Sequence, residues 1–167
     1  MENGKLRGIP SEWVEKLAAL PGVTTLLVEA DGAAGRPLKA PREDEPVLPQ
    51  ETSLLIPVVG IDALGSPLEE KHVFRSELGA RLLHLQPGQE VTPEIVADFL
   101  ALTVRKRPAA ARVIPFVNKM DLPGALAKGR ILARRILARE GIGALRVVLG
   151  NAKGSPPVRE IIDPGDP

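Results

Sequence analysis

Short runs of apolar residues alternate along the chain with segments in which apolar residues recur every three or four positions. The runs do not alternate apolar with polar residues, which is typical of strands buried on both faces of a parallel sheet. They cover Val23–Glu29, Ser53–Gly60, Ala111–Val117 and Leu145–Leu149. The pattern predicts a three-layer α/β fold in which helices cover a mostly parallel sheet of at least four strands.

The segments with helical periodicity also carry signals for helix ends. Thr92 precedes Pro93 and Glu94, which places a capping side chain, a proline at the first helical position and an acid in the first turn. Gly141 provides a stop for the basic segment that follows Asp121. The predicted helices run from Ser11 to about Leu20, from Pro93 to about Val104, and from after Asp121 to Glu140. The tail from Asp163 is expected to fray.

The length of 167 residues predicts a single α/β domain over residues 1–167. Cysteine is absent, which excludes disulfides, thiolate metal sites and thiol catalysis. With three Phe, one Trp and no Tyr, the chain has few side chains on which nucleic-acid bases could stack, so we expect no nucleic-acid partner. The longest apolar run, Leu54–Ile61, is too short to cross a membrane, and we expect a cytoplasmic protein with no membrane partner.

Charges are distributed unevenly although the net charge is only +1. The first 100 residues are net acidic and the remainder is net basic. Such asymmetry marks an anion-binding face or, more simply, the solvent-exposed side of the third predicted helix.

Polar residues follow three of the four predicted strands, where open parallel sheets bind their ligands. Asp31 comes just after the first strand, where nucleotide-binding folds place an acid that holds magnesium. The third strand ends in Asn118-Lys119-Met120-Asp121, which matches the Asn-Lys-x-Asp signature of guanine-nucleotide-binding proteins. There the Asp carboxylate accepts hydrogen bonds from guanine N1 and N2, a pair of donors that adenine lacks.

The fourth strand is followed by Asn151-Ala152-Lys153, which resembles the Ser-Ala-Lys loop that backs the guanine in the same proteins, with Asn in place of Ser. Its position one helix and one strand after Asp121 is the expected order. Simpler interpretations remain open for each motif. Asp31-Gly32 is a common turn, Asp121 would cap the next helix, and the Asn151 loop is an ordinary turn.

A phosphate loop of the form Gly-x-x-x-x-Gly-Lys-[Ser/Thr] is missing from the 167 residues. The nearest string begins at Gly124 and has Arg130 and Ile131 where the Lys and the hydroxyl would stand. We therefore expect an NTPase-like fold that does not hydrolyse nucleotide alone. His72 and His84 match no familiar metal spacing, and no serine lies in a Gly-x-Ser-x-Gly context.

Three strings make the sequence resemble the selenium-dependent hydroxylase accessory proteins of the YqeC type. They are Val28-Glu-Ala-Asp-Gly-Ala-Ala-Gly-Arg-Pro-Leu-Lys-Ala-Pro41, Val59-Gly-Ile-Asp-Ala-Leu-Gly65 and Asn118-Lys-Met-Asp121. The resemblance extends from about Trp13 to Ile162 and implies a fold related to P-loop NTPases. In that family a Gly-rich phosphate loop precedes the matching segment, so the chain is similar to the rear two-thirds of the family pattern.

The resemblance also implies roles for individual residues. Asp31 matches the family's presumed magnesium position, and Arg36 and Lys39 match a basic loop that would contact phosphate or an anionic partner. Residues 118–121 match its base-reading loop. The implied ligands are a guanine nucleotide and Mg²⁺, and the implied partners are a selenium- or molybdenum-dependent hydroxylase or its maturation machinery. The resemblance thus predicts a nucleotide-linked accessory protein for maturation of such a hydroxylase.

Two other functions remain open: a non-catalytic module that binds a partner, and one half of a split NTPase. In P-loop folds the strand of the phosphate loop usually lies between the strands that correspond here to Val23–Glu29 and Ser53–Gly60. Unpaired strand edges invite association. Either these two strands pair directly, or we expect a homodimer or a separate phosphate-loop polypeptide that fills the slot.

Overall fold

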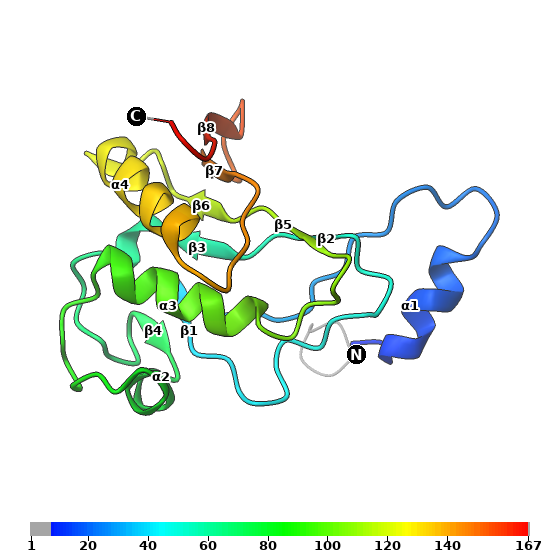
Figure 1. Cartoon of the computed structure of the whole chain (residues 1–167), viewed down its shortest axis with the longest axis horizontal. Helices are drawn as coiled ribbons and strands as arrows, with labels where there is room; N and C mark the ends of the chain where they lie inside the picture. Colours follow the sequence, from blue (N-terminus) through cyan, green and yellow to red (C-terminus); the bar gives the residue numbers. More distant parts are fainter. Residues whose placement is uncertain (1–7, 167) are drawn as a thin grey trace.

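The computed structural model describes residues 8–166 and has an α/β fold with small, mostly parallel sheets (Figure 1). The main sheet has the strand order β3-β6-β7-β8, and only β8 is antiparallel to its neighbour. These strands are Val58–Gly60, Phe116–Asn118, Val147–Gly150 and Val158–Ile162. The prediction of a mostly parallel sheet of at least four strands is confirmed, and the arrangement is compatible with a three-layer fold.

Two further pairs of very short parallel strands extend this framework. β1 (Leu38–Lys39) pairs with β4 (Val73–Phe74), and β2 (Leu54–Leu55) pairs with β5 (Arg112–Val113). The apolar run at 53–60 is therefore divided between β2 and β3, and the run at 111–117 between β5 and β6. Pro57 and Pro115 lie at the two divisions, where each lacks the N–H that a continuous ladder would use.

The helices of the described chain are α1, the single-turn η1, α2, α3 and α4. Their bounds are Ser11–Ala18, Ile61–Ala63, Ser76–Leu83, Pro93–Val104 and Ala125–Ala138. The predicted cap of α3 is confirmed, since Thr92 Oγ1 accepts a hydrogen bond from the backbone N–H of Ile95 at 3.4 Å. Helix α1 begins at Ser11 as predicted, and Pro10 precedes it without a side-chain cap.

Helices α3 and α4 pack against each other, and α4 contacts β7 and β8 (Figure 1). Val59, Val117 and Leu149 are neighbours across β3, β6 and β7 and are almost completely buried. The largest buried side chains of the two helices, Phe99 and Leu132, belong to the same core. The core is therefore mostly aliphatic, as the scarcity of aromatic residues predicts.

The opposite face of the main sheet also carries a row of apolar side chains. Val58, Phe116, Val148 and Ile161 are neighbours across the four strands. Val58 is 60% exposed and Ile161 is 44% exposed, so the row is open at both ends. Apolar residues in a row at the surface are unusual enough to mark a contact surface.

Val23–Glu29 is not a strand in the structure, and the prediction for this segment is wrong. Residues 24–30 form no backbone hydrogen bond with any other described residue. Val23, Leu26, Leu27 and Val28 are exposed, Leu27 by 89%. An apolar run becomes a strand only where another strand supplies hydrogen-bond partners, and β3 is not paired with this segment.

Several elements had no sequence prediction. These are β1, β4, α2 and β8. β8 lies in the region that precedes the tail, and its Arg159 and Glu160 interrupt the apolar pattern. Helix α1 extends to one side of the molecule (Figure 1), where Trp13 is 53% exposed. Among the described residues, no helix is both long and apolar enough to cross a membrane.

Candidate functional site

The two predicted base-reading loops lie together at the carboxyl ends of β6 and β7. Asn118 Oδ1 accepts hydrogen bonds from the backbone N–H groups of Lys119 and Ala152, each at 2.9 Å. The N–H of Met120 donates to the carbonyl of Gly150 at 3.0 Å. The side chain of Asn118 therefore ties the loop after β6 to the loop after β7.

Asp121 and Lys119 differ in what surrounds their charged groups. Asp121 is exposed, and its carboxylate has no hydrogen-bond or ion-pair partner within residues 8–166. Lys119 has a left-handed backbone with φ of 69°, and its Nζ donates to Asp62 Oδ2 at 2.6 Å. The ammonium is thus held by η1, while the carboxylate two positions later is available to a ligand.

The Asn151-Ala152-Lys153 loop is a tight turn. Asn151 Oδ1 accepts from the N–H of Lys153 at 3.1 Å, and the N–H of Asn151 donates to the carbonyl of Pro157 at 2.8 Å. Ala152 and Lys153 are exposed. The side chain of Asn151 therefore orders its own loop.

Asp31, Arg36 and Lys39 form a second group of predicted site residues. Lys39 Nζ donates to Asp31 Oδ1 and to the carbonyl of Gly32, and lies 3.1 Å from Glu45 Oε2. Arg36 Nε donates to the carbonyl of Glu70 at 3.2 Å. The basic side chains expected to meet phosphate are therefore engaged with acidic and carbonyl groups of the chain itself.

Glu45 and Arg75 complete this ion-pair cluster. Arg75 donates to both carboxylate oxygens of Glu45, with Nη2 at 2.9 Å from Oε1. The hydrogen bond from Arg75 lowers the pKa of Glu45 from 4.5 to about 2, against the opposing effect of burial. The same contact raises the pKa of Arg75. Arg36, Lys39 and Arg75 also lie within 6 Å of the Phe74 ring centre, at 5.4, 5.7 and 4.7 Å.

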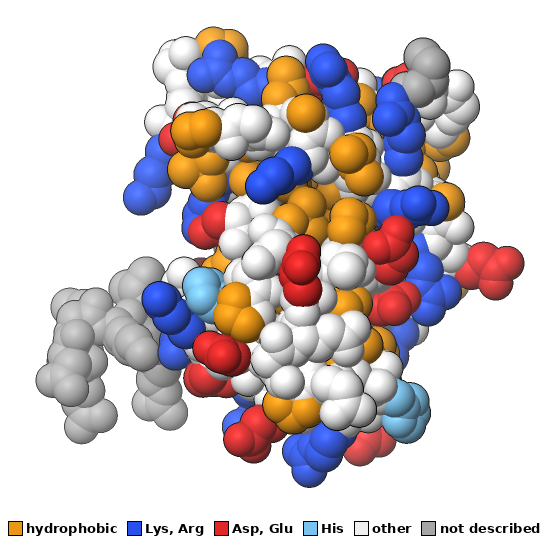
Figure 2. Space-filling model, turned by 90° about the vertical axis from the view of Figure 1, so that its left-hand side faces the viewer, with side chains coloured by type: hydrophobic (Ala, Val, Ile, Leu, Met, Phe, Trp, Pro, Cys, Tyr) orange, Lys and Arg blue, Asp and Glu red, His pale blue; other side chains and the backbone are white. Residues whose placement is uncertain are grey.

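A close backbone contact connects the ion-pair cluster with the part of the sheet edge that carries the two predicted base-reading loops. The N–H of Gly60, at the end of β3, donates to the carbonyl of Pro37 at 2.8 Å. A Cβ atom at Gly60 would lie 2.8 Å from the Cβ of Pro37, so only glycine permits this approach. Two residues later, Asp62 contacts Lys119. The carboxyl edge of the sheet thus joins the loop of Arg36 to the loop of Asn118, and Figure 2 shows side chains of both charges on this side of the molecule.

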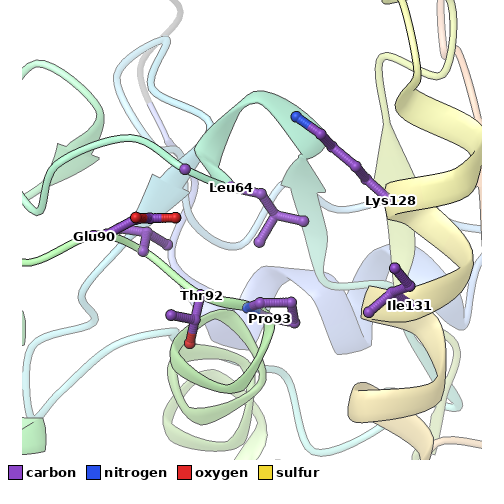
Figure 3. A pocket seen from close by; sticks show the side chains of 8 residues that line it. Leu64, Glu90, Thr92, Pro93, Lys128 and Ile131 are labelled. Carbon is purple, nitrogen blue, oxygen red and sulfur yellow. The ribbon is translucent and has the colours of Figure 1, made fainter.

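A pocket of about 220 Å³ lies close to this region (Figure 3). Its first lining residue along the chain, Leu64, is two positions after Asp62. Its walls come from the turn after η1, the start of α3 and one side of α4. They are formed by Leu64, Gly65, residues 90–93, Lys128 and Ile131. Lys128 and Glu90 give this small, mostly apolar pocket one charge of each sign.

Asp31, the predicted magnesium ligand, does not belong to a larger group of metal-ligating side chains within residues 8–166. Within residues 8–166, no group of three or more His, Asp or Glu side chains is arranged to hold a metal ion. A single carboxylate is compatible with Mg²⁺ only when phosphates and water supply the other ligands. Here that carboxylate is paired with the Lys39 ammonium, which magnesium would have to displace.

Sequence reasoning did not assign roles to Asp62, Glu45, Glu70, Phe74 or Arg75. Asp62 had an available signal, because it follows a buried strand as Asp31 and Asn118 do in the predicted pattern. Glu45 and Arg75 are 30 positions apart, and no local pattern connects them.

Comparisons with known proteins give a consistent result. Residues 1–77 match the family model described as "YqeC protein". The chain is also 30% identical over 136 residues to "Uncharacterized protein YqeC" of Escherichia coli (strain K12). That alignment covers 77% of this chain and 52% of the relative, so it spans about half of the relative's length. No solved structure matches the chain. Both comparisons therefore show that the chain is similar to YqeC proteins over part of its length.

Proposed function

We propose that this chain binds the base of a guanine nucleotide between the loop after β6 and the loop after β7. The observation that carries the proposal is the double hydrogen bond of Asn118, which holds Ala152 against the Asn-Lys-x-Asp loop. The Asp121 carboxylate in the loop after β6 is exposed. A carboxylate accepts well from the paired N1 and N2 donors of guanine, and adenine has no such pair.

The proposed biological role is a nucleotide-linked accessory function in maturation of a selenium- or molybdenum-dependent hydroxylase. The support for this role is the resemblance to the YqeC type together with the family match. Magnesium would be bound with the nucleotide, with Asp31 as its protein ligand after exchange of the Lys39 contact. The charge of the metal would neutralise phosphate oxygens, while this chain's residues hold the base.

The decisive experiment is a calorimetric titration with GTP, GDP and ATP in the presence of magnesium. We expect guanine nucleotides to bind more tightly than ATP, and Asp121→Ala to remove the preference. Hydrogen bonds to a charged group contribute about 1.5–3 kcal/mol, so the loss should be roughly tenfold to a hundredfold in affinity. Glu51→Ala removes an exposed carboxylate elsewhere and serves as the matched control.

Asp121→Asn gives a second, sharper readout. The amide would donate to the carbonyl that xanthine carries in place of the guanine amino group, so affinity should shift toward XTP. Equal affinity of the unmutated chain for GTP and ATP would contradict base reading by Asp121.

A second candidate function is a non-catalytic module that binds a protein partner through the loop of Arg36 and Lys39. The observation that favours it is the ion-pair cluster, in which both cations already have partners on this chain. Such pairing fixes the shape of the loop and leaves less charge for phosphate. Absence of binding to all three nucleotides in the titration would favour this function.

A further inference from the structure

A second pocket lies at the N-terminus of α2. It has a volume of about 390 Å³ and is lined by Arg42, Glu70, residues 75–78 and Arg81. This volume falls within the range of about 300–1,000 Å³ that is usual for small-molecule sites. The loops at 118–121 and 151–153 do not line it. The pocket is therefore separate from the proposed base site.

The first turn of α2 brings backbone N–H groups to this pocket. The N–H groups of Arg75 and Ser76 donate to Glu70 Oε2, at 2.8 and 3.2 Å. The N–H groups of Glu77 and Leu78 have no acceptor within residues 8–166. The N-terminus of a helix also carries a partial positive charge. These groups together favour a negatively charged ligand with several acceptor oxygens.

The hydroxyl of Ser76 is a second, independent sign of a ligand. Ser76 lines the pocket and is only 6% exposed, and its Oγ forms no hydrogen bond within the part of the chain that the structure describes. Ser66, the other buried serine of that part, donates its hydroxyl to the carbonyl of Ala63 at 2.7 Å. Buried polar groups are normally hydrogen-bonded. Ser76 Oγ is therefore a donor whose acceptor a ligand in the pocket would supply.

Two arginine side chains add positive charge to the pocket. Arg42 and Arg81 both line it, and neither guanidinium forms a hydrogen bond or an ion pair with another residue in the range 8–166. The guanidinium of Arg75, in contrast, already binds both carboxylate oxygens of Glu45. Guanidinium groups bind the oxygens of phosphate in a bidentate geometry. Arg42 and Arg81 are therefore available to a phosphate group.

The Glu70 carboxylate occupies part of this site in the free chain. One of its oxygens accepts from the first turn of α2, and the other lies 3.9 Å from Arg36 Nη2. The Glu70 side chain is 54% exposed, so it can turn toward solvent without leaving a buried charge. Glu77 also lines the pocket and is exposed. Both carboxylates oppose the entry of an anion, and Glu70 must move before one can bind.

We propose that this pocket binds the phosphate group of a small phosphate monoester, which displaces the Glu70 carboxylate from the N-terminus of α2. The three free oxygens of the phosphate then accept from the N–H groups of residues 75–78, from Ser76 Oγ and from the guanidinium groups of Arg42 and Arg81. A carboxylate has only two oxygens and would leave more of these donors unpaired. The inference does not depend on guanine binding by the loops after β6 and β7.

The test follows the backbone amide signals of the isotope-labelled chain by NMR at constant ionic strength and without nucleotide. The probes are glycerol phosphate, inorganic phosphate, acetate and glycerol. Glycerol phosphate should give saturable shifts at the amides of residues 75–78 and should bind about tenfold more tightly than acetate. Inorganic phosphate should bind more weakly than the ester, and glycerol should cause no shift.

Substitutions of the cations and of the buried hydroxyl test the individual contacts. Arg42→Gln and Arg81→Gln should each weaken binding of glycerol phosphate by about tenfold. Both side chains are exposed and unpaired among the described residues, so the circular dichroism of these variants should match that of the unmutated chain. Ser76→Ala should weaken binding while leaving the free energy of unfolding unchanged. Arg105→Gln removes an exposed guanidinium that does not line the pocket and is the matched control.

Glu70→Gln gives the most specific readout, because removal of a charged side chain from the pocket should improve binding. The variant removes the charge that competes with phosphate and should tighten binding severalfold. Glu69→Gln removes the same charge one position earlier, from a residue that does not line the pocket, and should have a much smaller effect. An equal gain from both variants would indicate a general effect of charge and would contradict displacement of Glu70.

Three further results would overturn the proposal. The first is the absence of saturable shifts at residues 75–78 with glycerol phosphate. The second is unchanged affinity in both Arg42→Gln and Arg81→Gln. The third is inorganic phosphate or acetate binding as tightly as glycerol phosphate, which would assign the pocket to a free anion and not to a phosphate monoester.

Discussion

Lys119 Nζ lies 2.6 Å from Asp62 Oδ2, so the loop after β6 is joined by a side-chain contact to the turn after β3. Both side chains are more than a third exposed, at 40% and 37%. Exposed pairs of this kind add little to stability because water screens their charges. The contact therefore matters more for the position of the Lys119 side chain beside the Asn118 loop than for the stability of the fold.

Asp62→Asn should change the free energy of unfolding by less than about 1 kcal/mol. It removes the charge that holds the Lys119 ammonium while keeping the side-chain volume. Urea denaturation followed by circular dichroism measures the effect, and Lys119→Met should give a similar small value. A loss of several kcal/mol from either variant would show that the pair stabilises the fold.

Asn118→Ala should be more costly, with a loss of about 1–3 kcal/mol in the free energy of unfolding. The substitution leaves the N–H groups of Lys119 and Ala152 without their shared acceptor. Denaturant unfolding gives the value, and Asn151→Ala is the matched control because its Oδ1 accepts only within its own exposed turn. Equal effects of the two substitutions would contradict a joining role specific to Asn118.

Glu45 should make the chain lose stability in acid. Its pKa in the folded state is about 2, below the ordinary value of 4.5, so its contribution is complete above the ordinary value and is lost as the pH falls toward 2. Glu45→Gln removes this contribution, so the difference in stability between the two proteins should be largest near neutral pH and should shrink toward about pH 3. Denaturation curves across this range measure it. Glu51→Gln, in an exposed position, should show no such trend.

Gly79→Ala should weaken the packing of α2 on α3. A Cβ atom at this position would lie 2.5 Å from Cζ and 2.7 Å from Cε1 of Phe99, whose ring is fully buried. Overpacking of a core costs about 1–3 kcal/mol, which exceeds the gain of up to about 1 kcal/mol from replacing a helical glycine. Thermal unfolding should show a lower midpoint for this variant. Gly8→Ala, where a Cβ meets nothing within 4 Å, should leave the midpoint unchanged.

Three of the four predicted strand regions and all three predicted helices are present because their signals are local. The runs at 53–60, 111–117 and 145–149 contain strands, and helices α1, α3 and α4 lie close to the predicted bounds. The approach of residues 118–121 to residues 151–153 also followed from the rule that carboxyl ends of parallel strands meet at one edge.

The features that the sequence did not predict correctly have a common cause. Each depends on residues that lie far away along the chain. Val23–Glu29 has the composition of a strand but finds no partner in the described chain. The cluster of Glu45 and Arg75 joins residues 30 positions apart, and charged residues in loops give no signal of such pairing. Strand composition is encoded locally, whereas pairing is decided by the rest of the fold.

The exposed position of Trp13 on α1 determines what intrinsic fluorescence can report. Trp13 is the only tryptophan, and the chain has no tyrosine, so emission excited at long wavelength comes from this one indole. It is 53% exposed on a helix at the side of the molecule. It does not belong to the buried core that contains Phe99. Its emission will therefore follow the surroundings of α1 and not the unfolding of the aliphatic core. A partner that covers α1 should shift this emission to shorter wavelength, which makes the single indole a built-in probe of association on that side of the molecule.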